Sequence, residues 1–266
     1  MLEVNHLSKT FQAGSIHEKK ALQDICLKVN RGDFITIIGS NGAGKSTLLN
    51  AIAGSFLPDS GRILLDDQDI TFMQEHQRAK YIGHLFQDPL KGTAPHMSVK
   101  ENLTLASLSA DQKKSPFSWI SRRECEEFQE RLKTLDMGLE DRMDTPVGNL
   151  SGGQRQALTL LMATIIPPKL LLLDEHTAAL DPKAAEKIMK LTQEIVEKYH
   201  ITCLMVTHQM KQALHVGNRT LMMNGGKIVL DIFGEERSHM TIYDLMEKFA
   251  DNSGDVLEDD RILLGK

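Results

Sequence analysis

The sequence predicts an α/β fold with a mostly parallel β-sheet, and three observations carry this prediction. Apolar segments at residues 34–38, 170–173 and 201–206 have the unbroken pattern of strands that are buried on both faces. Residues 46–53 and 182–199 supply helices after the first two of these strands. A glycine-rich turn joins the first strand to the first helix. The length of 266 residues allows one large domain of this class or two small ones.

The composition is that of an ordinary globular protein, with 41% hydrophobic residues and a formal net charge of −5. This charge provides no global basic field, so we expect no nucleic-acid partner. Cys26, Cys125 and Cys203 lack C-x-x-C spacing, which argues against structural zinc or a disulfide framework and favours three reduced thiols. The N-terminal segment lacks the apolar core of a signal peptide, and no run approaches the about 18 apolar residues of a membrane span.

The first half of the chain predicts strands on both sides of the glycine-rich turn. Residues 2–11 and 21–30 alternate in hydrophobicity and predict two strands, the first with an edge position in its sheet as one option. Residues 62–65 and 81–86 predict two more. Ser98 and Glu101 fit a capping box, so we expect a helix to start there and to turn Leu103 and Leu105 inward.

The second half predicts helices that alternate with strands and end in a tail. Residues 124–135 carry apolar positions at i, i+4 and i+7 and predict an amphipathic helix, and residues 150–154 open another that runs to Ile166. Gly225-Gly226, between two apolar runs, predicts a hairpin. Residues 241–250 have helical potential, and the acidic stretch to Asp260 is expected to be poorly ordered. Trp119 is expected to be a packing anchor.

Residues 39–47 match the phosphate-binding pattern G-x-x-x-x-G-K-[ST] in full, between a predicted strand and a predicted helix. The glycines let successive backbone N–H groups face one point, where the helix N-terminus adds partial positive charge. Lys45 can reach the β- and γ-phosphates, and the Ser46 hydroxyl can bind Mg²⁺. We therefore predict a nucleoside triphosphate site. Its residues are Gly39, Ser40, Asn41, Gly42, Ala43, Gly44, Lys45, Ser46 and Thr47.

Asp174 and Glu175 follow four leucines that predict a central strand. A carboxylate at the end of such a strand, beside a phosphate-binding loop, is placed to hold Mg²⁺ directly or through water. Glu175 is then placed to polarise the attacking water as general base. Without the phosphate-binding loop, this dipeptide would indicate only a loop at the end of a strand.

Together with further motifs, the sequence resembles the ATP-binding-cassette (ABC) ATPases from about Leu2 to Asp231. NLSGGQRQ at 149–156 resembles the family signature, and LLLLDEHTAALDP at 170–182 its Walker B segment and D-loop. FQDP at 86–89 resembles the Q-loop, and VTHQM at 206–210 the segment of the switch histidine. The resemblance implies a P-loop NTPase core, an antiparallel β-subdomain from the N-terminal strands, and an inserted helical subdomain at about 90–165. The cassette is expected to span residues 1–233, followed by a short tail at 234–266.

The resemblance also implies roles for individual residues, with ATP and Mg²⁺ as cofactors. Phe11 would stack on adenine, with an ordinary core position as the alternative. Gln87 would sense and help to bind Mg²⁺ near the γ-phosphate, and His208 would hydrogen-bond the γ-phosphate and order Glu175. Two copies would pack head to tail, so that the signature of one grips the γ-phosphate held by the other. The residues in this role are Ser151, Gly152, Gly153 and Gln154.

Two positions depart from the family pattern. His176 stands where the family usually has proline, so it is either a neutral substitution or an extra titrating group near the site. The segment ALTLLMATII after the signature is more apolar than is common, and we expect a changed packing face there.

Residues 87–103 resemble the region that receives the coupling helix of a membrane permease. The chain is therefore identified as resembling the separate ATPase subunit of a prokaryotic-type transporter, with import favoured over export. Its expected partners are a second copy, an integral-membrane permease and a solute-binding protein, and its expected location is the cytoplasmic face of the cell membrane. A soluble ABC ATPase, such as one of iron–sulphur assembly, is the alternative. The transported substrate is not encoded in this chain.

Overall fold

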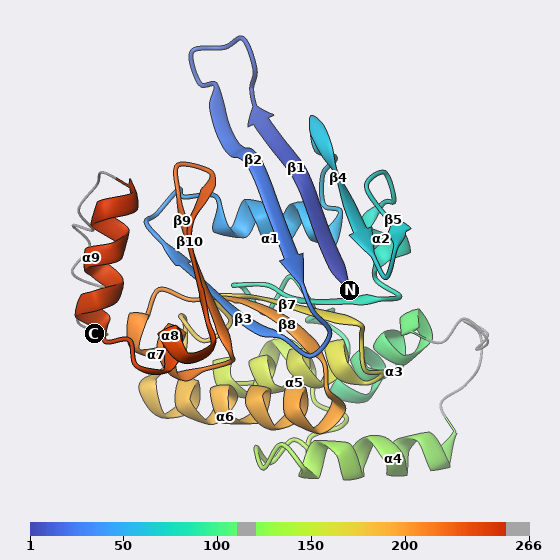
Figure 1. Ribbon diagram of the computed structural model, residues 1–266. Coiled ribbons are helices and arrows are strands. Elements are labelled where there is room, and N and C mark those ends of the chain that lie inside the picture. The colour runs from blue at the N-terminus through green and yellow to red at the C-terminus, as the bar shows by residue number, and fades with distance from the viewer. Residues whose placement is uncertain (111–120, 254–266) are drawn as a thin grey trace. The chain divides into compact units, whose positions relative to one another are not determined.

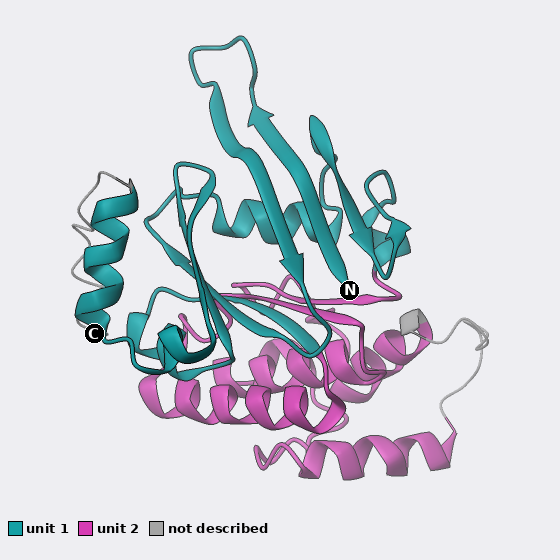
Figure 2. Ribbon diagram, in the orientation of Figure 1, with its two compact units in different colours: residues 1–78, 202–266 teal, residues 79–201 magenta. Residues whose placement is uncertain are grey.

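The computed structural model describes residues 1–110 and 121–253 (Figure 1). The chain divides into two compact units, Met1–Arg78 with Thr202–Lys266, and Ala79–Ile201 (Figure 2). The predicted packing role of Trp119 and the predicted disorder towards Asp260 lie outside the described residues. The predicted boundary of the cassette at residue 233 stays a prediction, as does the helical subdomain at 90–165.

The first unit contains a four-stranded antiparallel sheet in the order β2-β1-β4-β5. The four strands are β1 Leu2–Phe11, β2 Lys19–Val29, β4 Ser60–Leu65 and β5 Gln68–Asp69. Strand β1 pairs with β2 on one side and with β4 on the other, so an edge position for β1 is wrong. Hydrophobic alternation reports which face of a strand is buried, and it does not report whether both of its edges are paired.

A second sheet of the first unit carries the predicted phosphate-binding loop. Its strands are β10 Lys227–Phe233, β9 Arg219–Asn224, β3 Phe34–Gly39 and β8 Thr202–Val206, in this order. Strand β3 runs parallel to β8 and β9 and is buried throughout, as expected for a central strand. Strands β9 and β10 form the hairpin predicted at Gly225-Gly226. The helices of this unit are α1 Lys45–Ala53, α2 Glu75–Arg78, α7 Met210–His215, α8 Gly234–Ser238 and α9 Ile242–Ser253.

The C-terminal helices belong to the core of the first unit. The predicted helix at 241–250 is present as α9, and its Leu245 and Phe249 are buried in one cluster with Ile38 and Met222. Arg237 of α8 is also buried, and its guanidinium donates to the carbonyl groups of three residues and to one hydroxyl. These acceptors are Ala213 O, Val216 O, Gly217 O and Thr220 Oγ1. The tail is therefore fixed by apolar packing and by a buried cation.

Within residues 79–110 and 121–201, the second unit combines two parallel strands with four α-helices. Its elements are β6 Ile82–Leu85, α3 Val99–Ala110, α4 Arg122–Lys133, the 3₁₀ turn Val147–Asn149, α5 Gly152–Thr164, β7 Leu170–Asp174 and α6 Pro182–Tyr199. The predicted capping box before α3 is present, because the Glu101 carboxylate accepts from the Ser98 N–H at 2.7 Å. Leu103 is buried as predicted, but Leu105 is 44% exposed, so the prediction that it turns inward is wrong.

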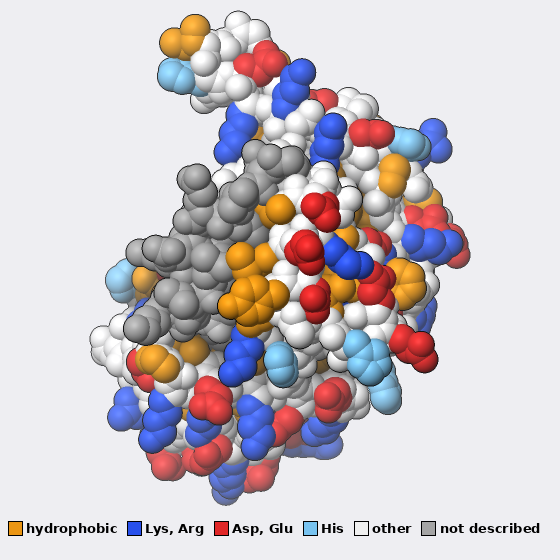
Figure 3. Space-filling view, turned by 60° about the vertical axis from the view of Figure 1, so that its left-hand side comes forward, with side chains coloured by type: hydrophobic (Ala, Val, Ile, Leu, Met, Phe, Trp, Pro, Cys, Tyr) orange, Lys and Arg blue, Asp and Glu red, His pale blue; other side chains and the backbone are white. Residues whose placement is uncertain are grey.

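The surface on the side shown in Figure 3 has interspersed acidic and basic side chains, in keeping with the small net charge. Among residues 1–110 and 121–253, none of the helices combines the length and the apolar character that crossing a lipid bilayer requires.

Candidate ATP-binding site

The phosphate-binding loop lies between β3 and α1, as the sequence predicts. Gly39 has φ of 146°, and a Cβ atom added there would lie 2.1 Å from the backbone oxygen of Met223 on the neighbouring strand. Gly44 is the N-cap of α1 with φ of 100°, and a Cβ atom there would lie 2.5 Å from the backbone oxygen of Ala21. Only glycine fits these two positions, so they let the loop turn sharply at the N-terminus of α1, where backbone N–H groups can bind phosphate.

Lys45 is the first residue of α1 and is 5% exposed. Its ammonium group donates to Gly39 O at 2.8 Å and to Ser40 O at 3.0 Å, so the side chain folds back over the loop. A cation held over a ring of backbone N–H groups suits the β- and γ-phosphates of a nucleotide. Ser46 follows on the same helix turn, where its hydroxyl has the oxygen chemistry that Mg²⁺ prefers.

The far end of α1 is closed by Arg78, which is fully buried. Its guanidinium donates to Ala51 O and Ile52 O at 2.8 Å each, and to Thr71 O and Met73 O at 2.9 Å each. Burial lowers the pKa of Arg78 to about 10, which still leaves the group charged at neutral pH. A cation at a helix C-terminus satisfies terminal carbonyl groups and opposes the helix dipole, so Arg78 fixes the helix that starts at the loop.

Phe11 lies at the end of β1 and is 37% exposed, so it is not an ordinary core residue. Its ring packs edge-on against Phe56, with ring centroids 5.2 Å apart. The ammonium group of Lys9 lies over both rings, at 5.7 Å and 5.6 Å from their centroids, and is held by Asp59. The sequence analysis named Phe11 alone for stacking and did not identify Phe56. Together the two phenylalanines form a half-exposed aromatic pair that could stack on a base.

His208 follows β8, which pairs in parallel with β3. The pairing of Ile37 with Val206 brings the carboxyl ends of these strands to the same edge of the sheet. Because the phosphate-binding loop follows β3 and His208 follows β8, both lie at that edge. The turn at His208 is shaped by Thr207, whose hydroxyl donates to Gln212 at 2.5 Å and accepts from the Gln209 N–H.

In the second unit, Gln87 and Glu175 follow the parallel strands β6 and β7, which pair with Leu85 opposite Leu173. The Gln87 amide donates to the Glu175 carboxylate at 3.2 Å, so the structure brings these two predicted site residues together. Glu175 has φ of 48°, a left-handed conformation that non-glycine residues seldom adopt. Such backbone strain is common where a side chain must be aimed at a ligand. Asp174, one residue earlier, is half-buried at the end of β7.

His176 is turned away from this polar edge. Its side chain is 2% exposed, and its Nε2 atom lies 3.1 Å from the Thr192 hydroxyl on α6. Because that hydroxyl donates to Ile188 O, the neutral imidazole donates through Nε2. Burial lowers the pKa of His176 to about 4, so it is neutral at neutral pH. Of the two readings of His176, the structure supports a substitution that packs against α6.

The signature segment forms the start of α5. Ser151 is its N-cap and forms a capping box with Gln154, in which each side chain accepts from the other residue's N–H at 3.2 Å. Ser151 and Gly152 are exposed, and Gly153 is buried. Arg155 braces the preceding turn by donating to the carbonyl groups of residues 147, 148 and 150. The segment therefore presents a helix N-terminus at the surface of its unit.

The predicted residues fall into two groups. The first unit holds Phe11, residues 39–47 and His208, and the second holds Gln87, Asp174, Glu175 and residues 151–154. The sequence analysis missed Phe56, Arg78 and Arg155. The loop could be identified because its glycines and lysine match a known sequence pattern. The roles of Phe56, Arg78 and Arg155 depend on contacts that only the folded structure reveals.

Comparison with known proteins identifies the family. The family model described as ABC transporter matches residues 22–178. The tyrosine transport ATP-binding protein of Clostridioides difficile is 41% identical over 249 residues, which cover 94% of this chain and 98% of that protein. The choline transport ATP-binding protein OpuBA of Bacillus subtilis is 32% identical over 86% of this chain, and the chain spans 56% of its length.

Solved structures agree with this assignment. A dimeric ATP-binding cassette in a post-hydrolysis state with ADP and phosphate has a TM-score of 0.75 and 27% identity, covering 88% of this chain and 98% of that one. The protein cbiO1 from Clostridium perfringens, part of the ABC transporter complex cbiONQ, has a TM-score of 0.72 and 28% identity, covering 94% of each chain. The chain therefore belongs to the ABC transporter family, and it is an ATP-binding subunit that hydrolyses ATP.

Proposed function

We propose that this chain powers the import of an amino acid, with aromatic amino acids as the first class to test, through a separate membrane permease. The observation that carries the proposal is the 41% identity to a tyrosine transport ATP-binding protein over nearly the full length of both chains. The choline, sulfate and methionine relatives are also named for transport of small solutes, at 32–37% identity. The substrate class is thus inferred from this likeness, and the roles of the site residues are inferred from the family resemblance together with their contacts in this chain.

In the first unit, the loop at 39–47 binds the phosphates through backbone N–H groups, and Lys45 moves from the carbonyl groups of Gly39 and Ser40 to the β- and γ-phosphates. The aromatic pair Phe11 and Phe56 stacks on adenine. His208, at the same edge of the sheet as the loop, hydrogen-bonds the γ-phosphate. These contacts order the nucleotide before hydrolysis.

In the second unit, Glu175 accepts a proton from the attacking water, and Gln87 holds the carboxylate in place through their hydrogen bond. In this unit, the predicted Mg²⁺ ligands Asp174 and Gln87 carry carboxylate and amide oxygens, which Mg²⁺ prefers over nitrogen or sulfur, and the predicted ligand Ser46 of the first unit carries a hydroxyl oxygen. When bound, Mg²⁺ would neutralise charge that builds up on the phosphate oxygens.

The exposed signature of one copy would complete the nucleotide site of a second copy. Ser151, Gly152 and Gly153 offer a hydroxyl and backbone N–H groups at a helix N-terminus, which favours an anion. ATP bridged in this way favours the closed pair, and hydrolysis removes the γ-phosphate contact that holds it. The dimeric cassette with ADP and phosphate supports a paired arrangement.

A groove in the second unit suits a permease segment. It has a volume of about 490 Å³ and lies among β6, residues 89–94, α3 and α5. Its lining combines apolar side chains, among them the exposed Leu105, with a nearly equal polar surface. Asn102, buried beside the groove, fixes its rim by accepting from the Ala94 N–H and donating to the carbonyl groups of residues 94, 97 and 98. A helix end with both apolar and polar side chains could therefore dock on this surface.

The test uses Glu175→Gln protein, which should bind ATP, lose turnover and accumulate as a dimer with ATP and Mg²⁺. Glu186→Gln, at an exposed position of α6, is the matched control and should stay active and monomeric. Size-exclusion chromatography with light scattering measures the dimer. A monomeric and fully active Glu175→Gln protein would contradict the assignment of the base.

The same Glu175→Gln protein, used as bait with gently solubilised cells of its source, should recover a multi-span permease. Deletion of that permease should abolish uptake of labelled tyrosine or phenylalanine. Uptake of another solute alone would overturn the substrate class. Recovery of soluble partners alone would favour the alternative, a soluble ABC ATPase such as one of iron–sulphur assembly.

A further inference from the structure

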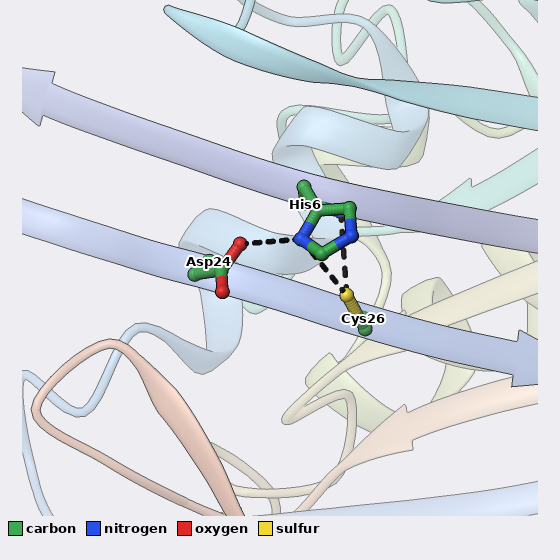
Figure 4. A group of neighbouring side chains, drawn as sticks. All are labelled: His6, Asp24 and Cys26. Atoms are coloured by element: carbon green, nitrogen blue, oxygen red, sulfur yellow. Dashed lines mark hydrogen bonds and ion pairs between the residues drawn. The ribbon is translucent and has the colours of Figure 1, made fainter.

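Three potential metal ligands meet on the outer face of the antiparallel sheet in the first unit (Figure 4). They are His6 on β1 and Asp24 and Cys26 on β2, and one donor atom of each lies within 4.8 Å of the others. His6 Nδ1 lies 2.8 Å from Asp24 Oδ1 and 3.6 Å from Cys26 Sγ. None of these residues belongs to the ATP site, and all three are exposed.

Local irregularities of the two strands bring these side chains together. The register of β1 and β2 shifts between Val4 and Leu7 and again between Leu7 and Lys9, which marks bulges in the ladder. His6 and Asp24 both have left-handed backbones, with φ of 52° and 54°. Because bulges re-aim side chains, His6 points across to β2, where Asp24 and Cys26 lie two residues apart on one face (Figure 4).

The arrangement is held by its surroundings as well as by its own contacts. Leu7 and Ile25, which pair between the bulges, are 0% and 1% exposed and anchor both strands to the core. The Ser8 hydroxyl accepts from the Asp24 N–H at 3.0 Å. Two neighbouring paired strands therefore present the three donors from fixed backbone positions, which reduces the entropy cost of gathering them around an ion.

We propose that His6, Asp24 and Cys26 form a binding site for a borderline-soft divalent cation of the Zn²⁺ class. Tetrahedral Zn²⁺, with bonds of about 2.0 Å to nitrogen and 2.3 Å to sulfur, requires an N···S separation of about 3.5 Å. The observed Nδ1···Sγ distance of 3.6 Å matches this edge. The Nδ1···Oδ1 distance of 2.8 Å is that of a hydrogen bond and must widen to about 3.3 Å when an ion replaces the shared proton.

The donor set also has the right charge and chemistry. A thiolate and a carboxylate together neutralise a divalent cation, and a mixed N, O and S set selects Zn²⁺ over Mg²⁺ or Ca²⁺. The backbone nitrogen of His6 lies 3.4 Å from Cys26 Sγ, so the backbone N–H can donate to the sulfur and stabilise the thiolate. Binding releases the thiol proton, and the proton of the neutral imidazole moves from Nδ1 to Nε2 so that Nδ1 can bind the ion. Three protein ligands leave a fourth position for water.

Cobalt(II) is the probe, because thiolate coordination produces a charge-transfer band in the near ultraviolet that oxygen and nitrogen ligands do not give. Untagged, reduced full-length protein is titrated with Co²⁺, and then with Zn²⁺ as competitor. We expect one equivalent of Co²⁺ to give the band and Zn²⁺ to abolish it. Binding at the predicted Mg²⁺ site gives no such band, since its donors are all oxygens.

Variants decide whether the band comes from this cluster. Cys26→Ser should remove the band, and His6→Asn and Asp24→Asn should each weaken Co²⁺ binding about 10-fold or more. Cys125→Ser, a cysteine of the other unit, should leave the titration unchanged. ATPase activity and circular dichroism confirm that each variant is folded. Absence of the band in the unaltered protein, its persistence in Cys26→Ser, or affinity unaffected by both His6→Asn and Asp24→Asn would overturn the proposal.

Discussion

The phosphate-binding loop and the signature segment are both glycine-containing turns that begin a helix, yet they are built in opposite ways. The loop has glycines in left-handed conformations against neighbouring backbone, an N-cap without a side-chain hydrogen bond, and a buried lysine. The signature has glycines without positive φ, an N-cap serine in a capping box, and an exposed hydroxyl. The first is completed inside its own unit by backbone. The second is held by side chains and leaves its helix N-terminus available to another chain.

Adding a methyl group at one glycine of each segment should give the largest difference between the two segments. Gly39→Ala places a Cβ atom 2.1 Å from a backbone oxygen in a strained conformation, so we expect loss of ATP binding and a destabilisation of about 4 kcal/mol or more. Gly152→Ala meets only the flexible Leu180 side chain at 3.3 Å, so it should fold and bind ATP as before. Thermal unfolding and fluorescent-nucleotide binding measure both. Equal damage by the two substitutions would contradict the comparison.

Removing the cation behind α1 should have the next largest effect. Arg78→Met leaves the carbonyl groups of Ala51, Ile52, Thr71 and Met73 without their donor, and we expect a destabilisation of about 2–4 kcal/mol. Arg62→Met, at an exposed position of β4, is the control and should stay within about 0.5 kcal/mol. Urea denaturation gives both values. A stability of Arg78→Met equal to that of Arg62→Met would show that α1 does not depend on this cap.

Acidification should test whether His176 is buried in its neutral form in the second unit. Burial lowers the pKa of His176 to about 4 from 6.5, so the unfolded chain binds this proton near pH 6.5 and the folded chain does so only near pH 4. The contribution is therefore complete above pH 6.5 and lost as the pH falls towards 4, by about 3 kcal/mol. His176→Phe should flatten the decline of stability over this range, and the exposed His17→Asn should not. An unchanged slope in His176→Phe would refute the buried neutral state.

The smallest effect on stability should come from the signature cap. Ser151→Ala removes the capping hydroxyl and should cost about 1 kcal/mol, as should Ser121→Ala in the matching capping box of α4. Under the proposed function the two differ in turnover, because Ser151 also contacts the nucleotide of the second copy. Steady-state ATPase assays should find Ser121→Ala unchanged and Ser151→Ala slower by about 10-fold or more. Equal turnover of the two variants would show that Ser151 has a purely structural role.

Local patterns predicted the parts of the fold that depend on neighbours in sequence. The loop at 39–47, the capping box at Ser98 and the hairpin at Gly225-Gly226 each need only a few adjacent residues, and each is present. The interior position of β1 depends on pairing with β4, which lies far along the chain. Such pairings leave no trace in hydrophobic alternation.

The missed residues share another physical reason. Arginine is usually exposed, so nothing in the sequence marks Arg78 as buried or shows which carbonyl groups it serves. Phe56 contacts Phe11 across 45 positions of the chain. Helical periodicity would assign Leu105 to the core, but this residue lines a groove instead. The ligands at His6, Asp24 and Cys26 converge through bulges, which residue spacing does not reveal.

The two buried arginines described above, Arg78 and Arg237, each bind the C-terminal end of a helix. Helix α1 starts at the phosphate-binding loop and ends on Arg78, and α7 starts two residues after His208 and ends on Arg237. Each helix begins beside residues that are predicted to bind the nucleotide, and a buried guanidinium binds the carbonyl groups at its C-terminal end. Because Arg237 belongs to the segment after β10, the C-terminal tail is hydrogen-bonded to the end of α7, the helix that follows His208. Substitutions that loosen α8 are therefore expected to weaken the packing of α7 and of the turn at His208.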